Sequence, residues 1–322
     1  MMVWLLGVAL TPTVFAAELS PAKLLAAGRV DDAILTLQGR ISAAPNDAES
    51  QNLLCRAYLT LTNWDASIAA CQKAVALSPQ NSQYHLWLGR AYGEKADNSS
   101  FLSATLLAKK VRDEFETAVR LDPGNVEARS DLADFYVQAP GIIGGGIDKA
   151  ANQAAQLASL DPAQAHLVRA HIAEKNNDQA AAEREFHAAI QASGGKPGTW
   201  MSLAQFYRRN NRLNEMQVAI EHATSATMSQ HVLLTAAEVL INTQRDLPAA
   251  SDLLRRYLAS ETVEDAPAFK AHCLLGSLLE QQGNPRAAAQ EYRDALSLAK
   301  DFAPAQEALR RLDRRADALN LH

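Results

Sequence analysis

The chain has 322 residues, of which 48% are hydrophobic and only 6% aromatic, and its formal net charge is −5 at pH 7. Acidic and basic side chains are well mixed, whereas a nucleic-acid-binding protein normally carries a strongly basic surface, so we expect no nucleic-acid partner. Abundant alanine and few β-branched runs favour helices over sheets, and the absence of long like-charge blocks argues against disorder.

The N-terminal segment, MMVWLLGVALTPTVFAAELS, carries no charged side chain before Glu18. An apolar run from Val3 to Leu10, a proline at position 12 and the small residue Ala16 resemble a secretory signal peptide at 1–16, although no basic residue precedes the run. The run is too short for a stable membrane span, and we expect no transmembrane segment after it. We therefore expect an exported protein, periplasmic or secreted, with a retained N-terminal anchor as the alternative.

A repeat follows this segment. Amphipathic stretches end at prolines 45, 79, 123 and 162, which are spaced by 34, 44 and 39 residues. The stretch YHLWLGRAY contains Trp87, Leu88, Gly89 and Tyr92, and LLCRAY, LADFY, LAQFY and LLGSLL are weaker copies of it. Small residues recur at fixed distances before the closing prolines, which allows two antiparallel helices to approach closely.

These residues resemble the tetratricopeptide repeat (TPR) family, whose period is 34 residues and whose signature is W-x2-L-G-x2-Y. The resemblance covers nearly all of the mature chain and implies an all-α fold, an α-α superhelix (TPR solenoid) of about eight helical hairpins plus a C-terminal capping helix. We place the solenoid at 17–303 and an arginine-rich capping helix, suited to the end of an open solenoid, at 304–322. The repeats lie near 18–45, 46–79, 80–123, 124–162, 163–194, 195–228, 229–262 and 263–300.

Two adjacent repeats carry extra residues at the turn inside the hairpin. In 93–111, leucines at helical spacing predict a second helix extended by about two turns, with Ser99 or Ser100 as its N-cap. In 139–148, APGIIGGGID lengthens the turn by five residues and lacks the lysine of a phosphate-binding loop. Equivalent turns of a solenoid line up, so we expect the two insertions to touch along one edge, here called the insertion edge. Ile142 and Ile143 either pack against the extended helix or are exposed for a partner.

We find no catalytic motif and no set of metal ligands at a typical spacing, so we expect no enzymatic activity, no cofactor and no metal. Histidines 166, 171 and 187 are interpreted as surface and groove residues. Cys55 and Cys71 fall on the two helices of one repeat, where they form either a disulfide or buried free thiols, and Cys273 is left over.

The resemblance implies a concave groove lined by the first helix of each repeat. The family's groove positions correspond here to Asn52, Arg56, Thr60, Leu86, Arg90, Ser130, Asp134, His171, Lys175, Gln205, Arg208 and Arg209. The lysine, asparagine and arginine set that holds chaperone tails in some TPR proteins is not found. The four arginines either bind an acidic or carboxylate-bearing peptide or are solvated or paired with nearby carboxylates.

We therefore expect a non-enzymatic protein–protein interaction scaffold of the cell envelope, which binds peptide segments or folded partners through the groove and the insertion edge. This expectation rests on analogy between folds and on the N-terminal segment. The alternatives are a periplasmic small-ligand or polysaccharide-binding module, or a regulatory subunit of an envelope enzyme. Self-association through the solenoid ends also stays open, although the arginine-rich last helix argues against it at that end.

Overall fold

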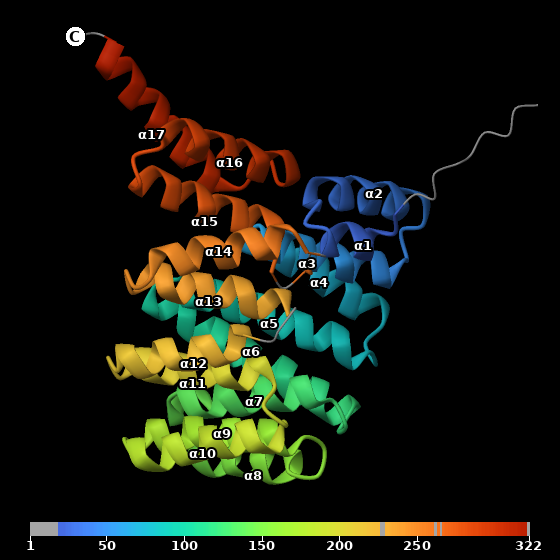
Figure 1. Ribbon diagram of the computed structural model, residues 1–322. Helices are drawn as coiled ribbons and strands as arrows, with labels where there is room; N and C mark the ends of the chain where they lie inside the picture. Colours follow the sequence, from blue (N-terminus) through green and yellow to red (C-terminus); the bar gives the residue numbers. More distant parts are fainter. Residues whose placement is uncertain (1–18, 226–228, 261–262, 265, 321–322) are drawn as a thin grey trace, which may run out of the picture.

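The computed structural model describes residues 19–225, 229–260, 263–264 and 266–320, so the expected signal peptide lies outside the described residues. Within these ranges the chain forms 17 α-helices and one short 3-10 helix, with no strand beyond one isolated bridge. None of the described helices has the length and apolarity that a bilayer span requires. Successive helices pair as hairpins that stack on one another (Figure 1), which confirms the all-α superhelix.

Eight hairpins and a final helix make up this superhelix. They are α1 (Pro21–Ala26) with α2 (Val30–Ala43), α3 (Ala48–Thr60) with α4 (Trp64–Leu77), α5 (Ser82–Asp97) with α6 (Phe101–Leu121), α7 (Val126–Gln138) with α8 (Ile147–Leu157), α9 (Pro162–Lys175) with α10 (Gln179–Ala192), α11 (Pro197–Arg209) with α12 (Leu213–Ser225), α13 (Gln230–Asn242) with α14 (Leu247–Leu258), α15 (Ala268–Gln281) with α16 (Pro285–Leu298), and α17 (Ala303–Asn320). The 3-10 helix η1 (Gly141–Ile143) lies between α7 and α8.

Local sequence explains where these helices begin and why they pack closely. Asn63 and Asn125 cap α4 and α7, because each side chain accepts a hydrogen bond from the backbone N–H three residues on. The glycine of the repeat signature makes room for an aromatic ring on the partner helix. A Cβ atom at Gly89 would lie 2.5 Å from the ring of Phe115, so the Leu-Gly pair is a packing requirement of the hairpin.

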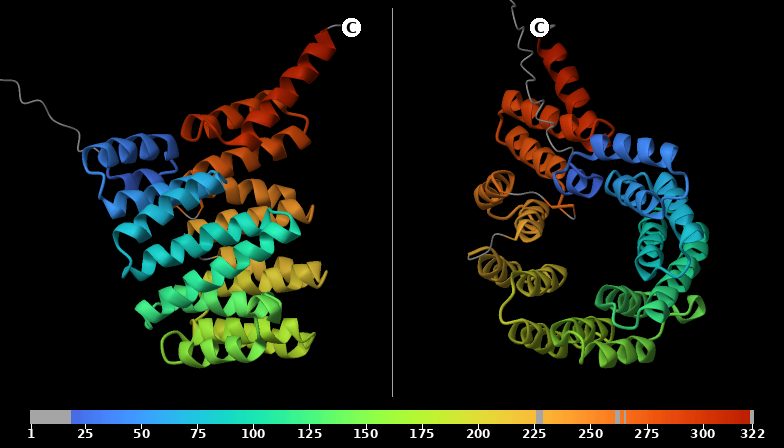
Figure 2. Two further views of the ribbon diagram at one scale, coloured as in Figure 1. Left: turned by 180° about the vertical axis from the view of Figure 1, so that it is seen from behind. Right: turned by 90° about the vertical axis from the view of Figure 1, so that its right-hand side faces the viewer.

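The superhelix closes on itself, which corrects the expectation of an open solenoid. Seen along its axis, the first hairpins lie beside the last ones (Figure 2). The backbone N–H of Lys300 donates to Asp31 at 2.8 Å, and a Cβ atom at Gly28 would lie 3.0 Å from the backbone nitrogen of Ala268. Leu25 and Phe302 belong to the same buried apolar cluster. Small rotations between neighbouring repeats add up to this closure, and no local motif encodes their sum.

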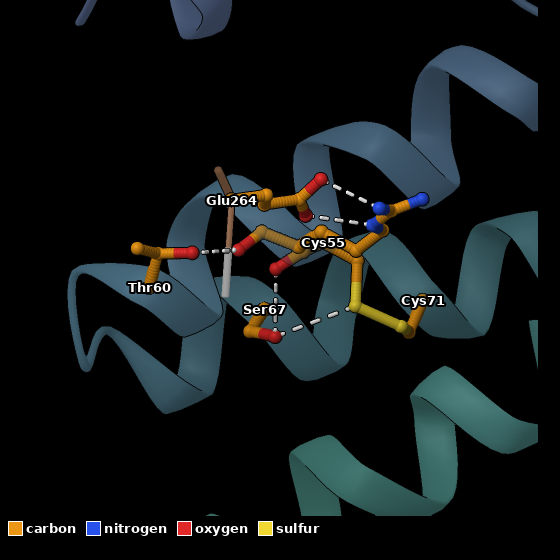
Figure 3. The surroundings of a disulfide bond; sticks show 6 residues. Cys55, Thr60, Ser67, Cys71 and Glu264 are labelled. Atoms are coloured by element: carbon orange, nitrogen blue, oxygen red, sulfur yellow. Dashed lines mark hydrogen bonds and ion pairs between the residues drawn. A yellow bond between two sulfur atoms is a disulfide. The ribbon is translucent and has the colours of Figure 1, made fainter. Parts of the chain in front are cut away.

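The second hairpin is cross-linked. Cys55 of α3 and Cys71 of α4 form a disulfide, with their Cα atoms 5.1 Å apart, and both residues are fully buried (Figure 3). The hydroxyl of Ser67 donates to the carbonyl oxygen of Cys55 at 3.0 Å, beside the bond. Of the two alternatives left open by the sequence, the structure has the disulfide. Cys273 is a free thiol, and burial raises its pKa to about 11.

Candidate functional site

The two arms of the closed superhelix together line a pocket of about 650 Å³, here called the luminal pocket. Because the superhelix closes, residues about 200 positions apart in sequence form opposite walls. One wall comes from α3, α5 and α7, and includes Arg56, Trp87, Arg90, Glu127 and Asp131. The facing wall comes from α13, α15 and the segment before α15, and includes His231, Glu264, Pro267 and Lys270.

Two of the expected groove arginines lie in this pocket beside Trp87. The guanidinium carbons of Arg56 and Arg90 lie 4.7 and 4.8 Å from the centre of the indole ring, within the range of cation–π contacts. Arg56 also makes a bidentate pair with Glu264, at 2.7 and 2.5 Å, across the closure of the superhelix. Arg90 contacts Asp131 at 2.7 Å. Both arginines are therefore already paired with carboxylates of the chain itself.

The other expected groove residues lie further along the concave side. His171 Nδ1 lies 2.7 Å from Asp134, so these two residues contact each other, and Arg209 forms a bidentate pair with Glu174 at 3.0 and 2.8 Å. Gln205 is half-buried and Arg208 is exposed. Three of the four groove arginines, Arg56, Arg90 and Arg209, thus form ion pairs with carboxylates of the chain itself.

Two positions carried over from the family face the core instead of the groove. Leu86 is fully buried and Asn52 is only 6% exposed, so their assignment as groove-lining residues is wrong. The residue after Leu86, Trp87, lines the luminal pocket instead. Successive side chains of an α-helix with 3.6 residues per turn point in directions about 100° apart. A one-residue error in the alignment therefore exchanges a core position for a groove position.

Burial and charge act against each other inside the site. Burial raises the pKa of Asp131, and the nearby guanidinium of Arg90 opposes that rise. Burial likewise raises the pKa of Glu238 on α13, with Lys270 and His231 opposing it. Among the described residues Lys270 forms no direct ion pair, and its charge acts on Glu238 only from a distance.

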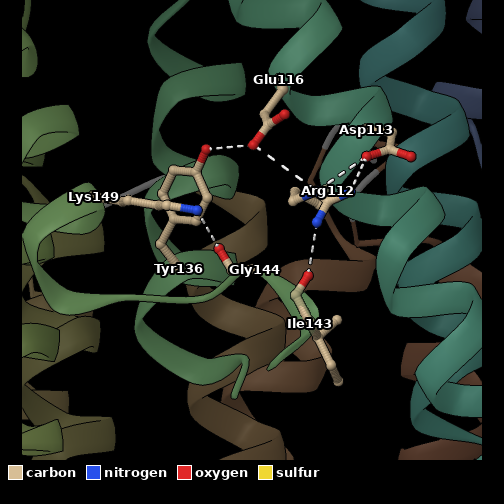
Figure 4. A network of polar contacts seen from close by, with 7 residues as sticks. All are labelled: Arg112, Asp113, Glu116, Tyr136, Ile143, Gly144 and Lys149. Atoms are coloured by element: carbon tan, nitrogen blue, oxygen red, sulfur yellow. Dashed lines mark hydrogen bonds and ion pairs between the residues drawn. The ribbon is translucent and has the colours of Figure 1, made fainter. Parts of the chain in front are cut away.

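The insertion 139–148 contacts α6, the helix that the other insertion extends, at the residue that follows 93–111. Helix α6 begins after Ser100 and runs for 21 residues, and its Arg112 donates to the carbonyl oxygen of Ile143 at 3.0 Å (Figure 4). Lys149 donates to the carbonyl oxygen of Gly144 at 2.8 Å. Ile142, in contrast, is 91% exposed. The loop is therefore anchored through its backbone, and it presents one of its two isoleucines to solvent.

One cluster of potential metal ligands was missed by the sequence analysis. The ligand atoms of His272, Glu291 and Asp294 lie within 4.8 Å of one another, and His272 lies 2.7 Å from Glu291. The same histidine–glutamate pair joins His166 to Glu185 at 2.7 Å in another hairpin. The recurrence of the pair identifies it as a contact that links the two helices of a hairpin, and we assign no metal to it.

Comparison with known proteins agrees with this architecture. The tetratricopeptide repeat family model matches residues 23–82, 53–94 and 243–307. Yeast Tom70 is similar in structure, with a TM-score of 0.56, 14% identity, and coverage of 97% of this chain and 67% of that one. A TPR protein of Thermus thermophilus has a TM-score of 0.45 and 19% identity, and it covers 60% of this chain and 99% of its own. A search of curated proteins gave no match. At these identities the similarity establishes the fold alone.

Proposed function

Because the chain belongs to the tetratricopeptide repeat family, we propose that it is a non-enzymatic scaffold of the cell envelope, which binds segments of partner proteins in the luminal pocket and along the insertion edge. A TPR solenoid supports protein–protein interaction in general. The location and the two binding surfaces are our proposal. The observation that carries it is the luminal pocket, where charged side chains from both arms of the closed superhelix converge.

The chemistry of the pocket restricts what binds there. An acidic peptide must compete with Glu264 for Arg56 and with Asp131 for Arg90, so these arginines do not favour it strongly. Lys270 lines the pocket without an ion pair to the described residues, and Trp87 lines it with its indole beside the two guanidinium groups. A segment with mixed polar groups and an aromatic or apolar side chain fits this arrangement better than a purely acidic one.

Two observations support a location outside the reducing cytoplasm. The N-terminal segment has the pattern of an export signal, and the buried Cys55–Cys71 disulfide belongs to a class of bond that persists mainly in oxidising compartments. Thiol labelling of intact cells followed by fractionation tests this proposal. We expect the protein in the envelope or secreted fraction with only Cys273 reactive after unfolding; a cytosolic protein with three reactive thiols refutes it.

A small-ligand module is the second candidate, because the volume of the luminal pocket, about 650 Å³, lies in the usual range for such sites. Trp87 beside two arginines would suit a planar or sugar-like ligand. Native mass spectrometry of protein purified from its own envelope tests this candidate directly. A bound small molecule that disappears in a Trp87→Ala variant favours it over the scaffold.

The scaffold proposal is tested by cross-linked capture from an envelope extract. Lys270→Glu reverses a charge in the luminal pocket without breaking an internal ion pair, and Lys73→Glu makes the same change at an exposed position on α4. Circular dichroism first shows that both variants fold. We expect partners that the wild type and Lys73→Glu retain and Lys270→Glu loses. Identical partner sets for all three proteins refute a role of the luminal pocket.

A further inference from the structure

The insertion edge carries an unusual concentration of exposed apolar side chains. The three most exposed large apolar residues among those described are Ile142 at 91%, Phe101 at 84% and Leu102 at 77%, and Leu106 at 66% lies on the same helix as the last two. All four belong to the two insertions, 93–111 and 139–148. Exposed apolar side chains gathered in two neighbouring insertions are typical of an interaction site.

A cleft of about 420 Å³ lies between α5, α6 and α7, and α6 is the helix that carries Phe101, Leu102 and Leu106. Its apolar lining includes Ala108, Val111 and Phe115 of α6 and Phe135 of α7. Its acidic lining consists of Asp97, Asp131 and Asp134, and no lysine, arginine or histidine lines it. We call it the acidic cleft.

The three carboxylates of the acidic cleft differ in how far they are neutralised. Asp131 contacts Arg90 at 2.7 Å and Asp134 contacts His171 at 2.7 Å, whereas exposed Asp97 forms no ion pair within the described residues. The nearest further cation is Lys175, which donates to the carbonyl oxygen of Gln138 at 3.4 Å, at the edge of the cleft. The cleft therefore keeps a net negative charge, concentrated at Asp97.

The apolar lining continues outward along α6. Phe115, Val111, Ala108, Ala104 and Phe101 follow at steps of four and three residues, so they share one face of the helix. Val111 and Phe115 are buried, Ala108 lines the acidic cleft and Phe101 is exposed. One apolar stripe thus leads from the interior of the cleft to solvent at the tip of the α5–α6 hairpin.

We infer that the acidic cleft and the exposed stripe beside it dock a cationic amphipathic segment of a partner protein. An apolar side chain of the segment fills the cleft between α6 and α7, and a lysine or arginine pairs with Asp97. The inference rests on the proposed scaffold function and names the chemistry of one partner. The acidic cleft itself is lined by three carboxylates and no cation, which favours a cationic segment over an anionic membrane. In α17 of a second copy, Arg311 and Arg315 pair with Glu280, whereas Arg310 and Arg314 form no ion pair within the described residues. Concentration-dependent dimerisation through α17 would therefore overturn the inference.

Fluorescence anisotropy with two labelled probes tests the inference. The probes are an amphipathic Leu/Lys peptide and a Leu/Glu peptide of equal length and hydrophobic spacing. We expect the Leu/Lys peptide alone to bind, with an affinity that falls as salt rises. Asp97→Lys should weaken binding roughly tenfold, because it converts an attraction into a repulsion. Asp313→Lys, the same change at an exposed position on α17, should change the affinity for the Leu/Lys peptide by less than about twofold.

A second pair of variants tests the apolar half of the site. Phe101→Ser is expected to weaken binding of the Leu/Lys peptide. Leu35→Ser, at an apolar position 72% exposed on α2, should leave that binding unchanged. Both positions are exposed, so neither change should disturb folding. Equal binding of the two probes, or equal effects of Asp97→Lys and Asp313→Lys, overturns the inference. So does binding to phosphatidylglycerol vesicles that requires Phe101 but is insensitive to Asp97→Lys.

The outcome is separable from that of the capture experiment. If Lys270→Glu strengthens binding of the Leu/Lys peptide, by turning a repulsion into an attraction, and Asp97→Lys has no effect, the peptide occupies the luminal pocket and the inference about the acidic cleft fails. Suppose instead that Lys270→Glu leaves the set of captured partners unchanged, while Asp97→Lys still weakens binding of the Leu/Lys peptide. The luminal pocket then has no role in partner binding, and the inference about the acidic cleft stands.

Discussion

Breaking the Arg56–Glu264 pair should open the closed superhelix. The pair joins α3 to the segment before α15, far apart in sequence, whereas most contacts of a solenoid link neighbouring repeats. We consider the variants Arg56→Met and Glu264→Gln and their combination. The bidentate pair between Arg209 and Glu174 joins neighbouring hairpins and serves as the matched control.

The expected magnitude follows from geometry and exposure. The side chains of Arg56 and Glu264 are 26% and 14% exposed, between the limits of a surface pair and a fully buried pair. Surface pairs contribute about 0–1 kcal/mol, and removing one partner of a buried pair costs about 3–5 kcal/mol. We therefore expect each single variant to lower the free energy of unfolding by about 2 kcal/mol. The coupling energy from the double-mutant cycle should be about 1–2 kcal/mol.

Urea denaturation and small-angle X-ray scattering check this prediction together. Both pairs should show a coupling energy, but only the Arg56–Glu264 variants should raise the radius of gyration of the native protein. If the radius of gyration stays at the wild-type value while the cycle shows coupling, the apolar contacts alone keep the superhelix closed. If the cycle shows no coupling, the pair contributes nothing to closure and our reasoning about it is refuted.

Three further outcomes follow from the contacts described. Gly145→Ala should cost several kcal/mol in urea denaturation, since the new Cβ atom would lie 1.8 Å from the carbonyl oxygen of Ala139, whereas Gly141→Ala, with no atom within 4 Å, should cost about 1 kcal/mol or less. Cys71→Ala removes a disulfide that spans 16 residues and should cost about 3 kcal/mol, an effect absent when both proteins are measured in reductant. The pKa of His85 is raised, chiefly by its hydrogen bond to a glutamate and against the effect of burial. Its contribution to stability should therefore be complete below pH 6.5 and lost as the pH rises through the raised pKa, and His85→Gln should flatten this part of the stability–pH curve.

The fold was predictable because each hairpin is encoded locally. The spacing of the prolines and the Trp-Leu-Gly-Tyr signature identify the repeat, and Gly89 against Phe115 shows the packing reason for the signature. The placement of the two insertions was predictable for the same reason, since each departs from a known period. The contact of Ile143 with Arg112, the residue that follows the insertion 93–111 on α6, is consistent with the alignment of equivalent turns.

Closure and the composition of the site were not predictable from one sequence. Glu264 meets Arg56 only because the rotations of the intervening hairpins add up to nearly a full turn, and each rotation depends on side-chain packing between neighbours. The sequence analysis therefore left open whether the groove arginines are free. It also placed Leu86 in the groove instead of Trp87, an error of one residue that the repeat alignment alone did not exclude.

Closure also explains why we assign different partners to the two surfaces. Inside the superhelix, Arg56 and Arg90 are held by carboxylates of the chain, so the luminal pocket selects by shape and by groups left unpaired, such as Lys270. On the insertion edge, Asp97 has no such partner, and the apolar stripe ends in solvent at Phe101. The two sites share Asp131, whereas Lys270 lines only the luminal pocket and Asp97 only the acidic cleft. Binding of the Leu/Lys peptide should accordingly depend on Asp97 and be unaffected by Lys270→Glu, and the reverse dependence would contradict the assignment of the peptide to the acidic cleft.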